Sequence, residues 1–196
     1  MTNKNANIRL LFPSVVYENH DSTLVNSDLI DFSKNICLNH GENFYITKCL
    51  TTIESKKYAN ILELEEFSEI KSYIIENIFN YISFMKFKTD IDYKFTASWL
   101  NYYYPGDFQE LHIHHNNMIS GVFYLLANDE EDFYFRSQLF HQQPILPYNQ
   151  EDNEYNQYSE KVTTFTGKLL LFMSGYLHGT LPSKNERMSI SFNVNF

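Results

Sequence analysis

Glu110-Leu-His-Ile-His-His115 is followed, after two asparagines, by Met118-Ile-Ser-Gly-Val-Phe-Tyr-Leu-Leu126. The second run is rich in β-branched and aromatic residues, which favours a β-strand for the whole neighbourhood. In a strand, residues two positions apart lie on the same face, at roughly 6.6–6.8 Å. His112 and His114 can therefore reach one ion from a strand, whereas in a helix they would lie about 200° apart and could not.

The segment before residue 89 contains the helical signals. The clearest predicted helix spans roughly Glu65–Met85, where apolar residues recur at three- and four-residue steps and leave charged residues for solvent. A face this regular is expected to be core packing and not a cofactor site. A shorter helix is predicted around Leu29–Ile36, with Ser27 as its N-cap. Before it, Ile8–Tyr17 reads as a strand that Pro13 confines to a sheet edge.

After Lys88 the pattern changes to short strand-like runs separated by turn signals. Many short strands after two helices predict a mostly β fold with flanking helices, built as a β-sandwich or barrel-like jelly roll. We expect a single domain over residues 1–196, with helical support over about 24–86 and the β core over about 93–196. The polar, acidic stretch Asn149–Glu160 is expected to be a surface loop and is a candidate lid. The predicted strands are Tyr93–Tyr104, Glu110–His114, Ser120–Leu126, Phe133–Ser137, Val162–Phe165, Lys168–Met173 and Arg187–Phe196.

The composition argues against several classes of protein. A net charge of −9 disfavours sequence-independent nucleic-acid binding, which requires a basic surface. No apolar run approaches the roughly 18 residues of a membrane span, and the first residues lack the apolar core of a secretion signal. Cys37 and Cys49 show no metal or redox spacing, so we expect two reduced thiols. We therefore expect a cytoplasmic protein (in the host cytoplasm if a phage encodes it) without a membrane partner. The edge strand leaves a homodimer open.

A third histidine and an arginine complete the candidate site. His178 follows the apolar run Leu169–Met173 and precedes Gly179, where a neighbouring backbone can approach closely. Two imidazoles on one strand fix adjacent coordination positions, and a third from a neighbouring strand completes a face, which leaves the opposite positions open. Arg187 shares a strand face with Ser189. Its guanidinium suits a carboxylate, at about 1.5–3 kcal/mol for each charge-assisted bond, although a surface salt bridge is the alternative for Arg187 taken alone.

The remaining histidines have simpler expected roles. His20, His40 and His141 are expected to be hydrogen-bonded structural residues. His115 alternates to the face opposite His114 and is expected to be a packing or supporting group.

Several short pieces of the sequence form a specific ordered set. In these pieces the chain resembles the 2-oxoglutarate/Fe(II)-dependent oxygenase superfamily, in particular the small bacterial and phage group labelled "putative 2OG-Fe(II) oxygenase". The resemblance covers nearly the whole chain from Leu10 onward, and the joint order and spacing of the pieces make it specific. The pieces are Leu11-Phe-Pro13, Ser98-Trp-Leu-Asn101, His112-Ile-His114 with Ser120-Gly-Val-Phe-Tyr124, Gly167-Lys-Leu-Leu-Leu-Phe-Met-Ser-Gly-Tyr-Leu-His178, and Arg187-Met-Ser-Ile-Ser-Phe-Asn193.

The resemblance implies a fold and a metal. The core would be a double-stranded β-helix, which is a cupin-like jelly roll. Fe(II) would be held by His112, His114 and His178.

The resemblance also implies a reaction. Arg187, helped by Ser189, would bind the distal carboxylate of 2-oxoglutarate, with Tyr104 and Asn101 as further contacts. Such enzymes use O2 to convert 2-oxoglutarate to succinate and CO2, and usually hydroxylate their substrate. Here the substrate would be a small molecule or a peptidyl side chain, and ascorbate is a candidate reductant.

One departure from the wider superfamily concerns His114. Most members present a carboxylate at this position, although His-x-His is usual in the small group. The lost negative charge should weaken retention of a divalent ion, so we expect the protein to lose iron easily. Two alternatives stay open. One is a cupin-type three-histidine metalloprotein, such as a thiol dioxygenase or an isomerase, which would not require Arg187 and Ser189 near the metal. The other is a metal-free binding domain.

Overall fold

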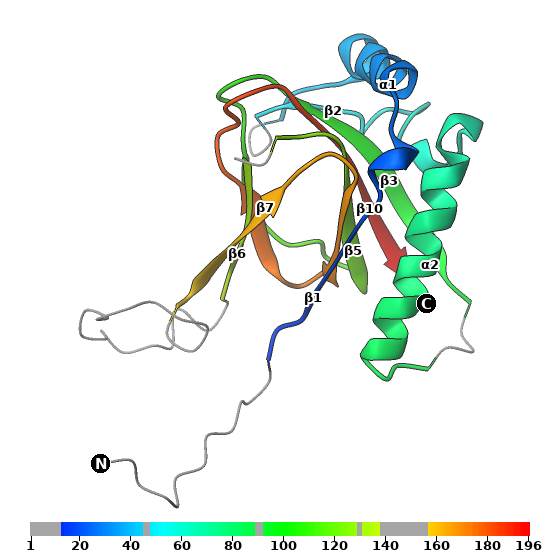
Figure 1. The fold of residues 1–196 in the computed structure, drawn as a ribbon, viewed down its shortest axis with the longest axis vertical. Coiled ribbons are helices and arrows are strands. Elements are labelled where there is room, and N and C mark those ends of the chain that lie inside the picture. Colours follow the sequence, from blue (N-terminus) through cyan, green and yellow to red (C-terminus); the bar gives the residue numbers. More distant parts are fainter. Residues whose placement is uncertain (1–12, 45–47, 89–91, 129–130, 138–156) are drawn as a thin grey trace, which may run out of the picture.

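Two antiparallel sheets and two helices make up the fold (Figure 1). The structure, a computed structural model, describes residues 13–44, 48–88, 92–128, 131–137 and 157–196. The helices are α1 (Ser27–His40) and α2 (Ser68–Phe84), with 3-10 turns at Ser22–Leu24, Ile61–Glu63 and Glu65–Phe67. The strands are β1 (Val16–His20), β2 (Leu50–Thr51), β3 (Lys94–Tyr103), β4 (Gln109–His112), β5 (Ile119–Leu126), β6 (Glu131–Arg136), β7 (Ser159–Thr164), β8 (Lys168–Met173), β9 (Leu177–Thr180) and β10 (Arg187–Asn195).

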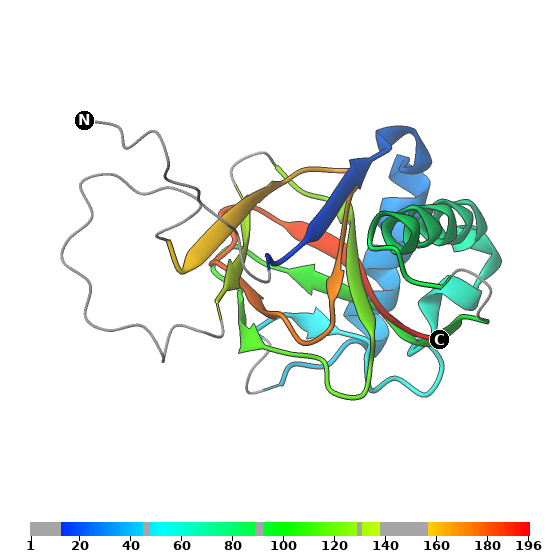
Figure 2. The same cartoon turned by 90° about the horizontal axis from the view of Figure 1, so that it is seen from below.

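The strand order confirms the predicted fold class. The larger sheet runs β1-β8-β5-β10-β3-β2 and the smaller one β4-β9-β6-β7. Figures 1 and 2 show α1 and α2 together on one side of the larger sheet, with the smaller sheet on the other side. The result is a jelly-roll core with flanking helices. The larger sheet also takes β1 and β2 from outside the range 93–196, so the expected core range omitted two short strands.

The larger sheet is buried on both faces, as β5 illustrates. Ile119, Phe123 and Leu125 belong to the core cluster shared with the helices. Val122 and Tyr124 belong to a second cluster that includes residues of the smaller sheet. Because successive side chains of a strand point to opposite faces, one unbroken apolar run serves two cores.

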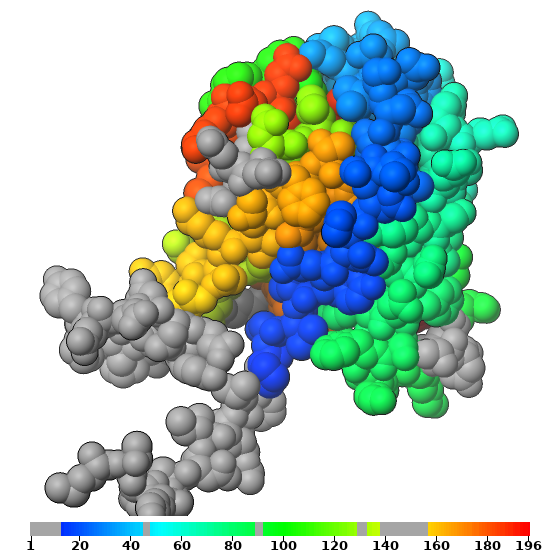
Figure 3. Space-filling view, in the orientation of Figure 1, coloured from blue at the N-terminus to red at the C-terminus, as the bar shows by residue number. Residues whose placement is uncertain are grey.

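The periodic helix is confirmed, with slightly shorter bounds. α2 begins at Ser68, because residues 65–67 form a 3-10 turn instead. Its buried Asn77 accepts hydrogen bonds from the Tyr17 hydroxyl (2.8 Å) and from the Asn19 amide (2.6 Å) and so fastens β1. Figure 3 shows β1, in blue, at the surface next to α2, in green. The residues of the predicted apolar face that are buried in α2 are Ile70, Ile74, Ile78, Tyr81 and Ile82.

The first helix differs from its prediction at both ends. Its N-cap is Asn26, whose side chain accepts from the Leu29 backbone N–H at 2.9 Å, and Ser27 is the first helical residue. Asn caps as well as Ser does, so the choice between adjacent candidates is not set by residue type alone. The helix also continues past Ile36 to His40, where Gly41 ends it.

Most predicted strands are present within a residue or a few residues of their expected ends. Two short strands, β2 and β9, were not predicted. The first strand, β1, runs over Val16–His20 and so continues past the predicted end at Tyr17. β1 is an edge strand, as expected. Residues 8–12 of its predicted range lie outside the described residues. The same is true of residues 149–156 of the predicted acidic loop, whose last two residues, Ser159 and Glu160, belong to β7.

One extra residue, Thr96, interrupts the pairing of β3 with β10. A bulge of this kind reverses the alternation of faces on its two sides. Phe95 therefore packs on Phe192 in the cluster beneath the helices, with ring centroids 5.9 Å apart. Trp99 and Asn101, further along the strand, face the space between the sheets.

Gly121 in β5 permits the close packing of two neighbouring strands. A Cβ atom there would stand 2.3 Å from Cζ of Phe192 and 2.8 Å from Cδ2 of Leu171, so a larger residue requires both side chains to move. In the part of the chain that the structure describes, no helix is long and apolar enough to cross a membrane. Cys37 and Cys49 are both free and buried.

We expect the substitution Gly121→Ala to lower the free energy of unfolding by about 1–3 kcal/mol, because it overpacks the core. Gly175→Ala is the matched control, since no atom lies within 4 Å of a Cβ built there, and it should change stability by less than about 0.5 kcal/mol. Chemical denaturation monitored by circular dichroism measures both. Equal stability of the two variants would contradict the packing argument.

Candidate active site

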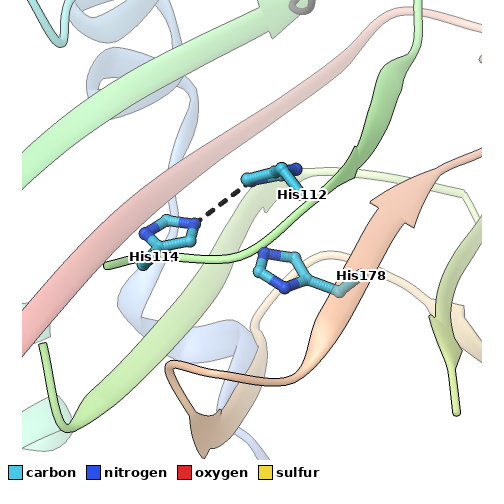
Figure 4. Close-up of side chains that lie close together, drawn as sticks. All are labelled: His112, His114 and His178. Atoms are coloured by element: carbon cyan, nitrogen blue, oxygen red, sulfur yellow. Dashed lines mark hydrogen bonds between the residues drawn. The ribbon is translucent and has the colours of Figure 1, made fainter. Parts of the chain in front are cut away.

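Three histidines converge from two strands of the smaller sheet. His112 ends β4 and is paired across the ladder with His178 of β9, while His114 lies two residues beyond the end of β4. The ring centroids are 4.4 Å apart for His112 and His178, 5.0 Å for His112 and His114, and 5.1 Å for His114 and His178. One nitrogen of each ring lies within 4.8 Å of the others. Figure 4 shows the three rings turned toward a common point.

Two of the rings have a fixed tautomer. Nδ1 of His112 is 2.8 Å from the Glu110 carbonyl oxygen, and Nδ1 of His178 is 2.7 Å from that of Tyr176. A carbonyl oxygen can only accept, so Nδ1 carries the proton and Nε2 keeps its lone pair. Nε2 of His112 lies 3.1 Å from Nε2 of His114, the contact drawn as a dashed line in Figure 4. Lone pairs gathered in this way form a ligand set for a transition metal.

Burial keeps the three rings neutral. Desolvation lowers the pKa of His112, and it lowers that of His114 to about 4 with a further contribution from the charge on His112. Desolvation followed by the charges on the other two rings holds the pKa of His178 well below its ordinary value. Neutral imidazole is the form that binds metal, so the set is ready to bind at neutral pH.

Aromatic side chains surround the histidines. The His114 ring stacks on Trp99, with centroids 5.7 Å apart and an angle of 21°. His178 is stacked on Phe133 at 5.4 Å and touches Phe172 edge-on at 4.6 Å. Gly179 makes room for β4, because a Cβ there would stand 2.7 Å from the Gln109 carbonyl oxygen. This is the close backbone approach expected beside His178.

Arg187 lies at the other end of the same cavity. It is buried, with 1% of its surface exposed, and its Nη2 donates to Oγ1 of Thr180 at 3.0 Å. Its guanidinium carbon lies 4.2 Å from the ring centroid of Tyr103. Thr180 follows His178 by two residues on β9, so both side chains point to the same face and connect the cationic end to the histidine end. Ser189 faces this cavity from the same strand as Arg187, as their spacing predicted.

Two connected hollows reach the histidines, which we call the inner cavity and the outer cleft. They share five lining residues, namely Trp99, Asn101, Gln109, His112 and His114. The inner cavity continues to Tyr103, Thr180, Arg187, Ser189 and Ser191. The outer cleft continues to Thr51, Ile53, Ile113, His115, Asn117 and Asn193.

The structure places the two further predicted contact residues differently. Asn101 lines the inner cavity, but Tyr104 does not, since it is 43% exposed and its ring packs on Tyr102 at 4.9 Å. Residues three apart on a strand point to opposite faces, so Asn101 and Tyr104 could not share one. Tyr103 lies two residues from Asn101, on the same face of β3, and lines the cavity. Counting in steps of two from Asn101 would have found it.

Of the other histidines that the structure describes, two lie away from the cluster and one lines the outer cleft. His20 contacts Phe165 at 5.6 Å and His40 contacts Tyr58 at 4.8 Å, measured between ring centroids. His115 is exposed and lines the outer cleft. His141 is outside the described residues. Thr180 and Trp99 were missed as site residues, although each is two residues from one that was found.

Comparison with known families agrees with this geometry. Residues 97–193 match the family model described as "Putative 2OG-Fe(II) oxygenase", a range that contains all three clustered histidines, Arg187 and Ser189. The chain belongs to the 2-oxoglutarate/Fe(II)-dependent oxygenase superfamily. No curated protein sequence matches this chain.

Solved structures share the fold of this chain at low sequence identity. A prolyl-4-hydroxylase from Pseudomonas putida has a TM-score of 0.62 at 15% identity, with 92% of each chain covered. The viral collagen prolyl hydroxylase of Paramecium Bursaria Chlorella virus-1, in its 2OG complex, has a TM-score of 0.55 at 15% identity, over 91% of this chain and 95% of that one. HygX from Streptomyces hygroscopicus, with nickel, 2-oxoglutarate and hygromycin B bound, has a TM-score of 0.57 at 10% identity, over 93% and 83%. The core is the double-stranded β-helix that the resemblance implied.

We expect the stability of the metal-free protein to fall as the pH falls from about 6.5 toward 5. The unfolded chain takes up protons near the ordinary histidine pKa of about 6.5, whereas the buried rings, with lowered pKa values, do not. Their contribution to folding is therefore complete above pH 6.5 and is lost below it, by up to about 1.4 kcal/mol per pH unit for each ring.

Denaturant titrations at several pH values would measure this slope. His114→Gln should make the slope shallower by the contribution of one ring. Equal unfolding free energies at pH 7 and pH 5 in the metal-free protein would show that the rings are not buried as neutral groups.

Proposed function

We propose that this protein is an Fe(II)- and 2-oxoglutarate-dependent oxygenase that hydroxylates a small molecule or a peptidyl side chain. The reaction consumes O2 and 2-oxoglutarate, places one oxygen atom in the substrate as a hydroxyl group and the other in succinate, and releases CO2. The observation that carries the proposal is a single cavity with three imidazole nitrogens at one end and a buried guanidinium at the other.

The histidine set fits Fe(II). His112, His114 and His178 would supply three neutral nitrogen ligands, which is a donor type that iron accepts. When bound, the iron supplies the redox chemistry that couples O2 to the oxidation of 2-oxoglutarate. Three neutral ligands leave the full charge of the ion uncompensated by protein, so we propose that the iron is readily lost, in line with the expectation from His114.

The guanidinium end fits a carboxylate. Arg187 is buried, and a buried cation is stabilised by an opposite charge and hydrogen bonds. A carboxylate placed against Arg187 would find the Ser189 hydroxyl and the Asn101 amide in the same cavity. Tyr103, whose ring lies against the guanidinium, would hold that side chain in position. Arg187 and the three histidines line the same inner cavity, so a diacid bound there could meet both.

The outer cleft is the proposed entrance for the substrate. Among the described residues that line it, none is Asp, Glu, Lys or Arg. Isoleucines and uncharged polar groups at its wall favour a neutral part of a substrate over a strongly charged one. The structural neighbours include prolyl hydroxylases and an enzyme with bound hygromycin B, so this fold accommodates both kinds of target that we propose. Phe133 and Phe172, packed on His178, would keep water from that side of the metal.

We further propose a cytoplasmic location, because the two buried free thiols suit a reducing compartment. The net charge of −9 makes nucleic acid an unfavourable partner.

Succinate formation tests the proposed function. With Fe(II), 2-oxoglutarate and ascorbate under air, we expect the purified protein to release succinate, and His112→Ala to abolish release. Arg187→Ala should weaken 2-oxoglutarate binding by about 2–5 kcal/mol, since it removes a buried charged partner, which corresponds to a rise of roughly 30-fold or more in Kd. Circular dichroism of both variants checks that they fold. Tightly held zinc with no succinate from the iron-loaded protein would refute the oxygenase and leave the cupin-type alternative.

The different positions of Tyr103 and Tyr104 give a second test. Tyr103→Leu should raise the Kd for 2-oxoglutarate several-fold, because it removes the ring that packs on Arg187. Tyr104→Leu, on the exposed face, should leave that Kd unchanged. Isothermal titration with the metal-loaded proteins measures both constants. If Tyr104→Leu proves the more damaging substitution, the assignment of Tyr103 fails.

A further inference from the structure

Two donors point at the hydroxyl group of Thr180. Its Oγ1 accepts from the backbone N–H of Gln109 and from Nη2 of Arg187, at 3.0 Å in each case. A hydroxyl oxygen has two lone pairs and one proton, so both lone pairs of Thr180 are in use. Toward any further group, this hydroxyl can therefore act only as a donor.

The proton of that hydroxyl has no protein acceptor among the residues that the structure describes. The four directions about the oxygen are roughly tetrahedral, and Cβ, Gln109 and Arg187 occupy three of them. Thr180 is 7% exposed and lines the inner cavity, so the fourth direction opens into that cavity and not into bulk solvent. The proton thus points into the space that a ligand of the cavity would fill.

Thr52 shows the usual arrangement for a buried threonine. Its Oγ1 accepts from the Leu100 backbone N–H at 3.1 Å and donates to the Tyr58 carbonyl oxygen at 3.1 Å. Both functions of that hydroxyl are satisfied within the protein, as is normal for a buried polar group. Thr180 also accepts from the backbone of a neighbouring strand, but its proton is left for a ligand.

The neighbouring cation decides which group of a ligand would receive the proton. Arg187 is buried at the same end of the cavity, and its guanidinium has donors but no lone pair to offer. Thr180 and Arg187 together therefore present only donors. The matching group is negatively charged and has only acceptors, which describes a carboxylate. An amide of the same shape carries an NH2 group, and one of its two sides would meet a donor with a donor.

We infer that the Thr180 hydroxyl donates to the carboxylate that Arg187 binds, and that Thr180 is a specificity-determining residue that excludes a neutral amide from this end of the cavity. This role rests on the proposed function in so far as the carboxylate is the distal group of 2-oxoglutarate. Arg187 supplies the attraction for a negative charge. The fixed direction of the Thr180 proton adds a penalty for a group with the wrong hydrogen-bonding pattern, because that group leaves a buried donor unpaired.

Two ligands that differ only in the distal group test this role. 2-Oxoglutaramate keeps the 2-oxo acid end of 2-oxoglutarate and carries an amide in place of the distal carboxylate. Isothermal titration into Co(II)-loaded protein gives the Kd of each ligand. The wild-type protein should bind 2-oxoglutarate about 100-fold more tightly or better, since the amide loses the charge and leaves a donor unpaired.

Thr180→Val keeps the shape of the side chain and removes the hydroxyl. It should raise the Kd of 2-oxoglutarate about 10- to 100-fold, the effect of losing a hydrogen bond to a charged group. It should leave the Kd of 2-oxoglutaramate unchanged or lower it, because the donor that opposes the amide is gone. A substitution that only displaced Arg187 would weaken both ligands, so the response of the amide separates the two explanations.

Matched variants separate this role from general stability. Thr180→Ser keeps the hydroxyl and should retain both affinities. Thr52→Val removes a buried threonine hydroxyl whose proton stays within the protein, so it should lower the unfolding free energy and change neither Kd. If Thr180→Val does not fold, Thr180→Ala carries the same comparison.

A third ligand makes the result independent of the metal. Glutarate has two carboxylates and no 2-oxo group, so the metal-free protein should bind it through Arg187 and Thr180. Thr180→Val should raise the Kd of glutarate by the same factor as that of 2-oxoglutarate.

The outcomes distinguish the role of Thr180 from the proposed function. Thr180-dependent binding of glutarate in a protein that forms no succinate would support the role and refute the oxygenase. Succinate formation, with both 2-oxo acids weakened alike in Thr180→Val or with neither weakened, would overturn the role and leave the oxygenase. A wild-type protein that binds neither glutarate nor 2-oxoglutarate would overturn both.

Discussion

The antiparallel pairing of β4 with β9 is the constraint on which the site depends. It sets His112 opposite His178, and the alternation along β9 then brings Thr180 to the same face, next to Arg187. A slip of one residue would turn both β9 side chains away from the cavity. These strands belong to the smaller sheet, whereas Arg187 belongs to the larger one. The metal end and the carboxylate end therefore meet only when the two sheets close on each other.

Much of this arrangement follows from the sequence, because strands impose a period of two. The period pairs His112 with His114 and Arg187 with Ser189, and the apolar runs of β5 and β8 predict strands buried on both faces. What the sequence does not set is pairing between strands. β9 is only four residues long and contains a glycine, so no local pattern marks it as a strand. Tyr103 and Tyr104 are the same residue type, so only their alternation along the strand distinguishes them.

The net charge of the protein and the charge inside the cavity would act differently on an anionic ligand. The protein as a whole carries a net charge of −9, which repels a dianionic cosubstrate from afar. Inside the cavity the three histidines are neutral, and the Arg187 guanidinium lies with them among largely uncharged residues. A dianion would gain its binding energy only after it has left water, where each charge-assisted bond is strongest. Such a site selects by fit within the cavity and gains nothing from long-range steering.

Thr96, the extra residue of β3, also has hydrogen-bond partners outside the sheet. Because of the bulge at Thr96, Phe95 packs beneath the helices, whereas Trp99 and Asn101 further along the strand face the inner cavity. The Thr96 hydroxyl donates to Oδ1 of Asn117 at 2.6 Å. The Nδ2 group of Asn117 in turn donates to the His115 carbonyl oxygen at 2.9 Å. His115 and Asn117 both belong to the wall of the outer cleft. The bulge that separates the two faces of β3 is thus hydrogen-bonded to the wall of the outer cleft.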